Sequence, residues 1–286
     1  MARLLKGKDV IEDLNNKLIA KVNDLKAGGI NPTLAILRVG ARPDDLSYEK
    51  GAIKRCEEVG VEVKVINLPE DVTEDIFFNE LNKLNYDKTI HGILMFRPLP
   101  KQIDGEKARK LLSSEKDVDG CTDLSLAGVF TNTNLGFCPC TAEAAMEMIK
   151  FYNIPLKGKK VAVIGRSLVI GRPVAMLLMH ENATVTICHT KTEDVPSITR
   201  NADIVVVASG QMESVGKEFL SEGQTVIDIG IGWNNKKNKL CGDVRFDEAE
   251  EIVDAITPVP GGVGGVTTSI LVKHVIEAAT RRSIKF

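Results

Sequence analysis

The sequence predicts an α/β protein with two open domains and a ligand cleft between them, the second domain being a Rossmann-like, doubly wound parallel sheet. Three observations support this fold class. The chain has 286 residues, which is long for a single domain. Short apolar runs typical of buried parallel strands alternate with amphipathic helical segments. In the middle of the chain, Lys159–Glu181 has the pattern of a strand, a glycine-bearing turn and the start of a helix.

The composition is typical of a soluble globular protein, with 43% apolar and 27% charged residues. The net charge of −2 gives no indication of binding to nucleic acid or to a membrane surface. No segment approaches about 18 consecutive apolar residues and the N-terminus lacks a signal-peptide core, so we expect a cytoplasmic protein. The six cysteines are scattered, and Cys138 and Cys140 are too closely spaced for the common zinc motifs. This pattern predicts reduced thiols and no metal site.

The first half of the chain alternates strands with helices, which predicts an open α/β domain over residues 1–140. Helices are predicted for residues 10–27, 46–59, 72–84 and 104–112, and strands for residues 33–39, 61–68 and 90–96. Asp44 or Asp45 is a candidate cap for the second helix, and Gly60 ends it.

The second half predicts an NAD(P)-binding domain over residues 141–267. The predicted strands cover residues 160–165, 183–189, 203–209 and 225–230, and the predicted helices cover residues 141–152, 171–181, 195–202 and 216–222. A Gly/Pro-rich loop follows at residues 258–265. The last segment, residues 268–286, contains a helix at 268–281 and is expected to return to the first domain.

The turn between Gly165 and Gly171 predicts an anion site. Free backbone N–H groups and the positive end of the helix dipole suit a phosphate or pyrophosphate there. Charged and hydroxyl donors follow in the same turn, namely Arg166, Ser167 and Arg172. Five residues separate the two glycines, unlike in the usual dinucleotide fingerprint, so an ordinary α/β turn stays an alternative.

The end of the second strand of this sheet indicates which cofactor binds. NAD-binding sheets usually carry an acidic residue there to hold the ribose hydroxyls. This strand ends in His189, Thr190 and Lys191 without a carboxylate. Hydroxyls and a lysine suit a 2′-phosphate, which favours NADP and leaves NAD as an alternative. A solvated loop charge is the alternative reading of Lys191.

Five motifs occur in order along nearly the whole chain. They are Val39–Tyr48, Lys116–Gly120 (Lys-Asp-Val-Asp-Gly), Pro139–Thr141 (Pro-Cys-Thr), Gly165–Pro173 (Gly-Arg-Ser-x3-Gly-x-Pro) and Ile256–Gly264 (Ile-Thr-Pro-Val-Pro-Gly-Gly-Val-Gly). With these motifs the sequence resembles the methylenetetrahydrofolate dehydrogenase/cyclohydrolase family, the FolD-type proteins. The resemblance implies oxidation of 5,10-methylene- to 5,10-methenyltetrahydrofolate with hydride passing to NADP, in a homodimer formed through the cofactor domain. It also implies that the domain over residues 1–140 binds folate and carries the catalytic residues.

The resemblance also implies roles for individual residues. Asp119 resembles the carboxylate that binds the amino-pyrimidine edge of the pterin, and Tyr48 a stacking or positioning residue. The implied catalytic residues are therefore Tyr48 and Asp119. The implied substrate-binding residues are these two with Pro258, Gly261 and Gly262. The implied cofactor-binding residues are Gly165, Arg166, Ser167, Gly171, Thr190, Lys191 and Ile231. The alternatives are a plain polar turn at Asp117 and Asp119, and a half-buried core residue at position 48.

Two residues depart from the pattern of the family. The lysine to which the family's cyclohydrolase chemistry is attributed, four residues after the tyrosine, is Ala52 here. The glutamine that hydrogen-bonds near that lysine is Phe96. Lys50 and Lys54 lie about 200° and 240° around the helix from Tyr48, so neither replaces the missing amine.

Hydride transfer depends mainly on positioning. Attack of water on the methenyl carbon needs an acid and a base. We therefore expect a dehydrogenase with weak or absent cyclohydrolase activity. One alternative is a fully bifunctional enzyme that uses Arg55, Arg97 or a water. Remoter alternatives are a non-catalytic folate or nucleotide binder and a shikimate-type dehydrogenase.

Overall fold

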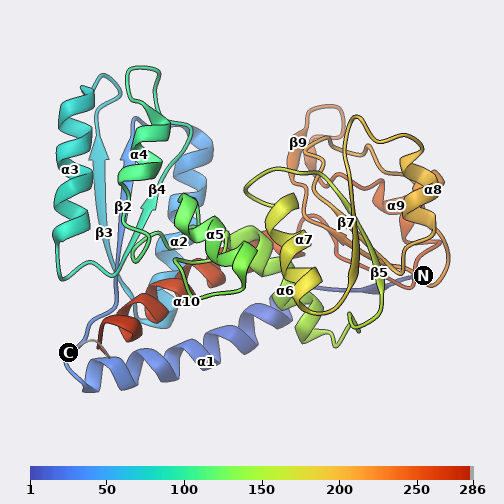
Figure 1. Cartoon of the computed structure of the whole chain (residues 1–286), viewed down its shortest axis with the longest axis horizontal. Coiled ribbons are helices and arrows are strands. Elements are labelled where there is room, and N and C mark those ends of the chain that lie inside the picture. The colour runs from blue at the N-terminus through green and yellow to red at the C-terminus, as the bar shows by residue number, and fades with distance from the viewer. Residues whose placement is uncertain (284–286) are drawn as a thin grey trace. The chain divides into compact units, whose positions relative to one another are not determined.

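The computed structural model describes residues 1–283 and divides into two compact units. The six-stranded unit consists of Met1–Glu12 and Thr141–Thr267, and the three-stranded unit consists of Asp13–Cys140 and the chain from Thr268. Figure 1 shows the elements of both. Because each unit contains a parallel sheet with helices, the predicted α/β class is confirmed.

The three-stranded unit has the strand order β3-β2-β4, with all neighbours parallel. The central strand β2, Thr33–Val39, is buried at every residue. At the edge, β3 (Glu62–Leu68) alternates between exposed and half-buried residues, whereas β4 (Gly92–Met95) is fully buried. The apolar run at β2 and the alternation at β3 therefore match a central and an edge strand.

The helices of this unit begin at capping residues that the sequence supplies. The side chains of Thr73, Asp104 and Thr122 accept hydrogen bonds from the first turns of α3 (Glu74–Tyr86), α4 (Gly105–Leu111) and α5 (Asp123–Thr131). The remaining helices are α2 (Pro43–Val59) and two helices whose first turns belong to the six-stranded unit, α1 (Gly7–Ala27) and α10 (Val263–Ser283).

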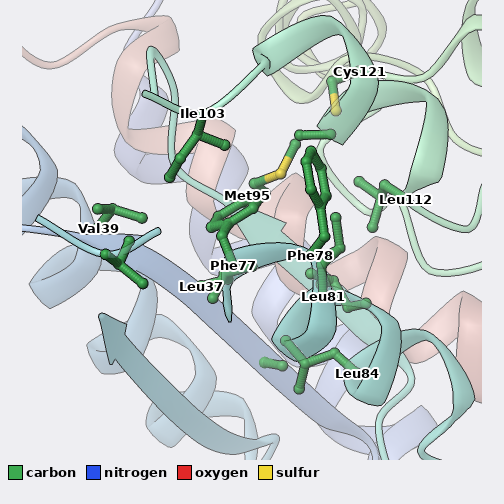
Figure 2. Packing of buried hydrophobic residues seen from close by; sticks show 14 of the residues in the cluster. Leu37, Val39, Phe77, Phe78, Leu81, Leu84, Met95, Ile103, Leu112 and Cys121 are labelled. Atoms are coloured by element: carbon green, nitrogen blue, oxygen red, sulfur yellow. The ribbon is translucent and has the colours of Figure 1, made fainter. Parts of the chain in front are cut away.

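One apolar cluster fixes α3 and α4 to this sheet (Figure 2). Phe77 and Leu81 of α3 are fully buried, together with Leu37 of β2. Met95 of β4 and Leu112 after α4 complete the contact surface. Burying each such side chain contributes roughly 1.5–3 kcal/mol to folding. This packing therefore fixes the positions at which the loops after β2 and β4 begin.

The six-stranded unit has the parallel order β1-β11-β8-β7-β5-β6. Its strands are β1 (Arg3–Leu4), β5 (Lys160–Ile164), β6 (Thr184–Cys188), β7 (Ile204–Val207), β8 (Thr225–Asp228) and β11 (Ala255–Ile256). The connecting elements are α6 (Cys140–Phe151), α7 (Gly171–His180), α8 (Val195–Arg200), the 3-10 helix η1 (Lys217–Phe219), α9 (Phe246–Ala249) and a hairpin of β9 (Gly232–Asn234) and β10 (Lys239–Cys241). From β5 the chain runs to β6 on one side and then to β7 on the other. The prediction of a doubly wound parallel sheet is confirmed.

Several predicted boundaries are wrong. Residues 1–12, which the sequence placed in the first domain, belong to the six-stranded unit because β1 pairs with β11. The final helix begins at Val263, within the predicted loop 258–265 and five residues before the predicted start, because Val263 and Val266 are buried at helical spacing. Of the predicted segment 268–286, residues 284–286 lie outside the described residues.

The start of α2 also differs from the prediction. The helix begins at Pro43 after Arg42, whose side chain makes no capping hydrogen bond. Proline at the first helical position explains this start, because its fixed φ suits the helix and its missing N–H leaves no partner unsatisfied. Asp45 therefore lies inside the first turn, where its carboxylate binds the Arg42 guanidinium at 2.8 Å.

A nearly buried ion pair joins β2 to α2. The Nε of Arg38 donates to Oε2 of Glu49 at 2.9 Å, and the two side chains are 7% and 12% exposed. Replacing one partner leaves an unpaired buried charge, which costs about 3–5 kcal/mol. We therefore expect Glu49→Gln to lower the free energy of unfolding by about 3 kcal/mol in urea titrations. The matched change at an exposed pair, Glu80→Gln opposite Lys83, is expected to cost under about 1 kcal/mol. Equal losses in the two variants would contradict this prediction.

Candidate functional site

In the three-stranded unit, Asp119 and Arg97 face each other across two loops. Arg97 lies two residues after β4, and Asp119 follows a segment that pairs with β4 through the hydrogen bond from Ile93 N to Lys116 O. The Arg97 Nη2 donates to the Asp119 Oδ2 at 3.3 Å. Both side chains are partly exposed, so a ligand has access to this pair.

Asp119 is a carboxyl group close to its titration point at neutral pH. Burial raises its pKa from the ordinary value to about 6, and the negative charge of Asp117 adds to this. The nearby Arg97 guanidinium, and more weakly His274, act in the opposite direction and favour the ionised form. The group is therefore mostly an anion at pH 7 and becomes protonated as the pH falls below about 6.

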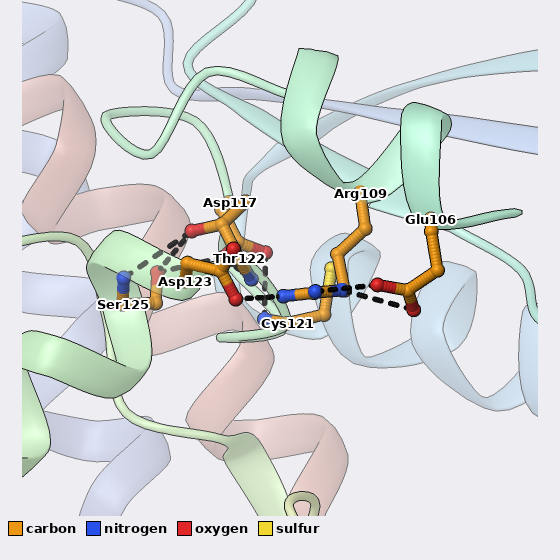
Figure 3. Close-up of polar contacts among 7 residues, drawn as sticks. All are labelled: Glu106, Arg109, Asp117, Cys121, Thr122, Asp123 and Ser125. Atoms are coloured by element: carbon orange, nitrogen blue, oxygen red, sulfur yellow. Dashed lines mark hydrogen bonds and ion pairs between the residues drawn. The ribbon is translucent and has the colours of Figure 1, made fainter.

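Asp117 has a different function from its neighbour two residues away. Its carboxylate is fully buried and accepts hydrogen bonds from the backbone N–H of Cys121 at 3.0 Å, from that of Thr122 at 2.7 Å and from the Ser125 hydroxyl at 2.6 Å. Figure 3 shows these bonds at the start of α5. Asp117 therefore fixes the turn that leads from the Asp-Val-Asp-Gly motif into α5, and the alternative of a polar turn applies to this residue.

Gly120 allows the same turn to close. Its φ is +69°, and a Cβ at this position would overlap the backbone of Cys138 and Pro139. Only glycine combines this conformation with such a close approach of two chain segments. The motif thus consists of an anchoring aspartate, a required glycine and, between them, the partly exposed carboxylate of Asp119.

Tyr48 and Phe96 form an aromatic pair beside this carboxylate. Their ring centroids are 5.9 Å apart and the rings are nearly perpendicular, at 89°. Ala52, one helical turn after Tyr48, is fully buried, and Phe96 is 9% exposed. Burial, and next the charge of Asp119, raise the pKa of Tyr48 well above its ordinary range. The phenol therefore stays protonated at neutral pH.

The basic residues of α2 point to other surroundings. Lys50 and Lys54 are exposed, and the Lys54 ammonium lies 3.9 Å from the Glu58 carboxylate. The Arg55 guanidinium binds the same carboxylate at 2.5 Å. The exposure of Lys50 and Lys54 agrees with the prediction, from their angles around the helix, that neither lysine replaces the missing amine. Arg55 is paired with Glu58.

In the six-stranded unit, a cavity of about 590 Å³ lies where β5, β6 and β7 end. This is the point at which the strand order reverses, and doubly wound sheets bind their ligands there. Four of the sequence-predicted cofactor residues line it, namely Gly165, Arg166, Ser167 and Thr190. Further lining residues that the sequence analysis did not assign to the cofactor include Thr192, Gln211, Ser214 and Phe219. Most of these lie in loops without a recognisable motif, which explains why they were missed.

The turn after β5 has the features of an anion site. Gly165 has φ +121°, and a Cβ there would overlap the Ala208 carbonyl oxygen, so glycine is required. The helix α7 begins without a side-chain cap, so the positive end of its dipole lies at this turn. Within the turn, the Arg172 N–H donates to the Ser167 carbonyl at 3.0 Å and the Ile170 N–H to the Ser167 hydroxyl at 3.1 Å. Within residues 1–283, no carboxylate pairs with Arg166, which is exposed beside the cavity. These features suit a phosphate group.

Three other predicted cofactor residues do not line this cavity. Gly171 is buried and packs against the Gly165 carbonyl, so it supports the turn. Lys191 is exposed next to the cavity, and its backbone N–H donates to Nδ1 of His189 at 3.1 Å. Ile231 is 59% exposed and precedes the hairpin of β9 and β10.

The predicted substrate loop around Pro258 belongs to the six-stranded unit, whereas Tyr48 and Asp119 belong to the other unit. The backbone N–H of Gly7 donates to the Gly261 carbonyl at 2.8 Å, and the first turn of α1 thereby fixes the loop. Gly262 is buried against Gly7, whereas Pro258 is half-buried and Gly261 is exposed.

Comparison with known proteins identifies the family. Residues 5–119 match the catalytic domain of tetrahydrofolate dehydrogenase/cyclohydrolase, and residues 139–283 match the NAD(P)-binding domain of the same family. This chain belongs to the tetrahydrofolate dehydrogenase/cyclohydrolase family. The resemblance inferred from the five motifs is thereby confirmed, and so is the presence of an NAD(P)-binding domain.

Relatives of this dehydrogenase/cyclohydrolase family member extend over nearly its whole length. The bifunctional protein FolD of Carboxydothermus hydrogenoformans is 50% identical over 279 residues, which are 97% of each chain. The crystal structure of FolD from Campylobacter jejuni has a TM-score of 0.95 at 37% identity and covers 99% of this chain and 100% of that one. The FolD of Trypanosoma brucei, solved with NADP and an inhibitor, has a TM-score of 0.92 at 34% identity, with 100% and 99% coverage.

Three further observations concern this chain. In the part of the chain that the structure describes, no helix is long and apolar enough to cross a membrane. Over the same residues, no group of three or more histidine, cysteine, aspartate or glutamate side chains is arranged to hold a metal ion. The described cysteines are all free thiols.

Proposed function

We propose that this protein oxidises 5,10-methylenetetrahydrofolate to 5,10-methenyltetrahydrofolate, and that its cyclohydrolase activity is weak or absent. The proposal of weak or absent cyclohydrolase activity rests on the residues that surround Tyr48. Ala52, which is fully buried, lies one turn after Tyr48 on α2, and the Phe96 ring packs edge-on against the Tyr48 ring. The family resemblance places a lysine and a glutamine at these two positions. Two apolar side chains therefore replace an amine and an amide.

The two half-reactions make different demands on these side chains. For hydride transfer, the protein binds the bridging carbon and orients it, and no side chain moves a proton at that carbon. The NADP, when bound, supplies the acceptor for the hydride. Hydrolysis of the methenyl group needs a base for the water and an acid for the ring nitrogen. A methyl group and a phenyl ring supply neither.

Other amines of the unit are engaged elsewhere. Lys116, in the Lys-Asp-Val-Asp-Gly motif, is buried, and its ammonium donates to the carbonyls of Leu84 and Asp87 at 2.7 Å each. Burial lowers its pKa to about 8. Lys50 and Lys54 are exposed on α2. These contacts support the proposal, because no lysine among them is placed beside Tyr48 to transfer a proton.

In the proposed complex, Asp119 accepts two parallel N–H hydrogen bonds from the amino-pyrimidine edge of the pterin. Such charge-assisted bidentate contacts are among the strongest hydrogen bonds in proteins. Tyr48 positions the substrate with its protonated phenol and its ring, and Pro258, Gly261 and Gly262 are proposed as further substrate-binding residues.

A fully bifunctional enzyme is the second candidate. Two observations favour it: several relatives are named as bifunctional FolD proteins, and Asp119 has a pKa raised to about 6. A carboxyl group that titrates near neutral pH has the acidity required of a general base. The route would then run through Asp119 or a water that it holds.

Two assays distinguish these functions. NADPH formation from 5,10-methylenetetrahydrofolate, followed by absorbance, is expected to proceed, and its absence would favour a non-catalytic binder. Loss of added 5,10-methenyltetrahydrofolate is expected to proceed at the rate of buffer alone. Clear enzymatic hydrolysis would reject the single-activity proposal in favour of the bifunctional one.

We propose NADP as the cofactor because Arg166 and Thr190 line the cavity and Lys191 stands next to it. A 2′-phosphate carries negative charge, so we expect Lys191→Ala to raise the KM for NADP on the order of threefold to tenfold and to leave the KM for NAD unchanged. Lys160→Ala, an exposed change at the start of β5, is the control and is expected to alter neither. Equal effects on both cofactors would remove Lys191 from the site.

The homodimer and the cytoplasmic location, both expected from the sequence, are also part of the proposal. Sedimentation velocity tests the dimer, and a single species with the mass of one chain would reject it.

A further inference from the structure

Arg97 is a cation placed against the carboxylate that the proposed function assigns to the pterin. We propose that Arg97 is a substrate-positioning residue, which holds the Asp119 carboxylate in one orientation and compensates its charge. This inference rests on the proposed function, in which Asp119 accepts hydrogen bonds from the substrate. It adds a residue that lies next to Phe96, one of the two departures from the family pattern.

The backbone around Arg97 is fixed from α2. The Arg42 guanidinium binds Asp45 through two hydrogen bonds of 2.8 and 2.9 Å, and it also donates to the Arg97 carbonyl at 3.3 Å. The Arg97 Nη2 then reaches Asp119 Oδ2 at 3.3 Å. The side chains of this pair are 31% and 26% exposed, so solvent screens their attraction less than that of a surface pair.

The groups around Asp119 differ in whether they favour its ionised form. Asp117 of the same motif disfavours the anion, as burial does. Tyr48 of α2 and Cys121, just before α5, face the carboxylate as neutral groups, because burial raises the pKa of each. His274 of α10 favours the anion, but less than Arg97 does. Arg97 is therefore the main partner that keeps Asp119 ionised.

The ion pair leaves room for a substrate. A carboxylate has two oxygens with about four acceptor positions, and Arg97 occupies one of them on Oδ2. Two parallel N–H donors can bind the remaining positions while the guanidinium stays in place. Among residues 1–283, the Nε of Arg97 is buried and has no hydrogen-bond partner. A costly unpaired donor of this kind is uncommon in folded proteins and calls for a functional explanation.

The test is the pH dependence of KM and kcat for 5,10-methylenetetrahydrofolate in Arg97→Leu, between about pH 5 and about pH 8. We expect KM at pH 7 to rise on the order of tenfold, with kcat within about twofold of the native value. We also expect the midpoint of the kcat/KM profile to move to higher pH, because Asp119 loses the cation that favours its anion. Arg97→Lys is expected to keep the native midpoint, since it keeps the charge.

The control is Arg109→Leu, which removes ion pairs to Glu106 and Asp123 without touching Asp119 (Figure 3). Its pH profile is expected to match that of the native protein. Should thermal unfolding show that Arg97→Leu is misfolded, Arg97→Gln, which is polar and uncharged, is expected to show the same shift in midpoint.

Asp119→Ala separates the two hypotheses. If this variant loses substrate affinity while Arg97→Leu and Arg97→Gln keep the native midpoint and KM, the role of Arg97 is overturned and the proposed function stands. If Asp119→Ala binds the substrate normally, the proposed pterin contact fails, and the role of Arg97 fails with it.

Discussion

The double variant Ala52→Lys, Phe96→Gln is expected to hydrolyse 5,10-methenyltetrahydrofolate on the order of 10²-fold to 10⁴-fold faster than the native protein, the usual contribution of acid–base catalysis. Position 52 is buried on the same face of α2 as Tyr48, so an amine there points toward the tyrosine. Burial lowers the pKa of a lysine toward neutral pH, which suits proton transfer. The assay is the decay of methenyltetrahydrofolate absorbance, corrected for the rate in buffer.

The matched control is Ala52→Met, Phe96→Gln, which adds a side chain of similar length without an amine. It is expected to remain at the rate of the native protein, and both variants are expected to keep NADPH formation within about tenfold of native, since hydride transfer needs no proton carrier. The same gain in both variants would mean that added space or water, not the amine, limits hydrolysis. No gain in either would show that the water is not activated beside Tyr48.

Asp119→Ala is expected to lower kcat/KM for 5,10-methylenetetrahydrofolate on the order of 10²-fold to 10³-fold, because it leaves a buried donor edge of the pterin without its charged acceptor. Affinity for NADP, measured by fluorescence titration, is expected to be unchanged, because the proposed cofactor residues belong to the other unit. Asp123→Asn, at an exposed carboxylate of the same segment, is the control and is expected to leave kcat/KM near native.

The activity of the native protein is expected to depend on pH through the ionisation of Asp119. The anion of Asp119 accepts both N–H bonds and the protonated acid does not. Activity is therefore expected at pH values above about 6 and is lost as the pH falls below that value, where Asp119 becomes protonated. A profile for kcat/KM that is flat between about pH 5 and about pH 7 would contradict this assignment.

Much of the fold follows from local patterns. The apolar runs at β2 and β5 and the helical spacing in α3 predicted those elements. Each strand or helix buries apolar residues whose spacing can be recognised in the sequence. The two-residue strand β1 has no such pattern. It exists because its backbone pairs with β11, about 250 residues further along the chain. The helix α5 was missed although Thr122 caps it, because Phe130 on its surface is 68% exposed and interrupts an amphipathic pattern.

The candidate site was predictable only in part. The resemblance implied that Asp119 binds the pterin, but it gave no role to Asp117. Hydrogen bonds distinguish the roles of the two aspartates, because the Asp117 carboxylate accepts the bonds that fix the turn into α5. The ion pair between Arg97 and Asp119 joins residues 22 positions apart, and no local pattern indicates such a pair. For Lys191, the charge was visible in the sequence, but its position outside the cavity lining was not.

The pairing of β1 with β11 has a consequence for how the chain is made. The ribosome releases Arg3 and Leu4 about 250 residues before their partners Ala255 and Ile256. Until Ala255 and Ile256 are made, β1 has no partner strand, so residues 1–12 join the six-stranded unit late. A gene fragment that begins at Thr141 would for the same reason encode an incomplete sheet with β11 as an unprotected edge.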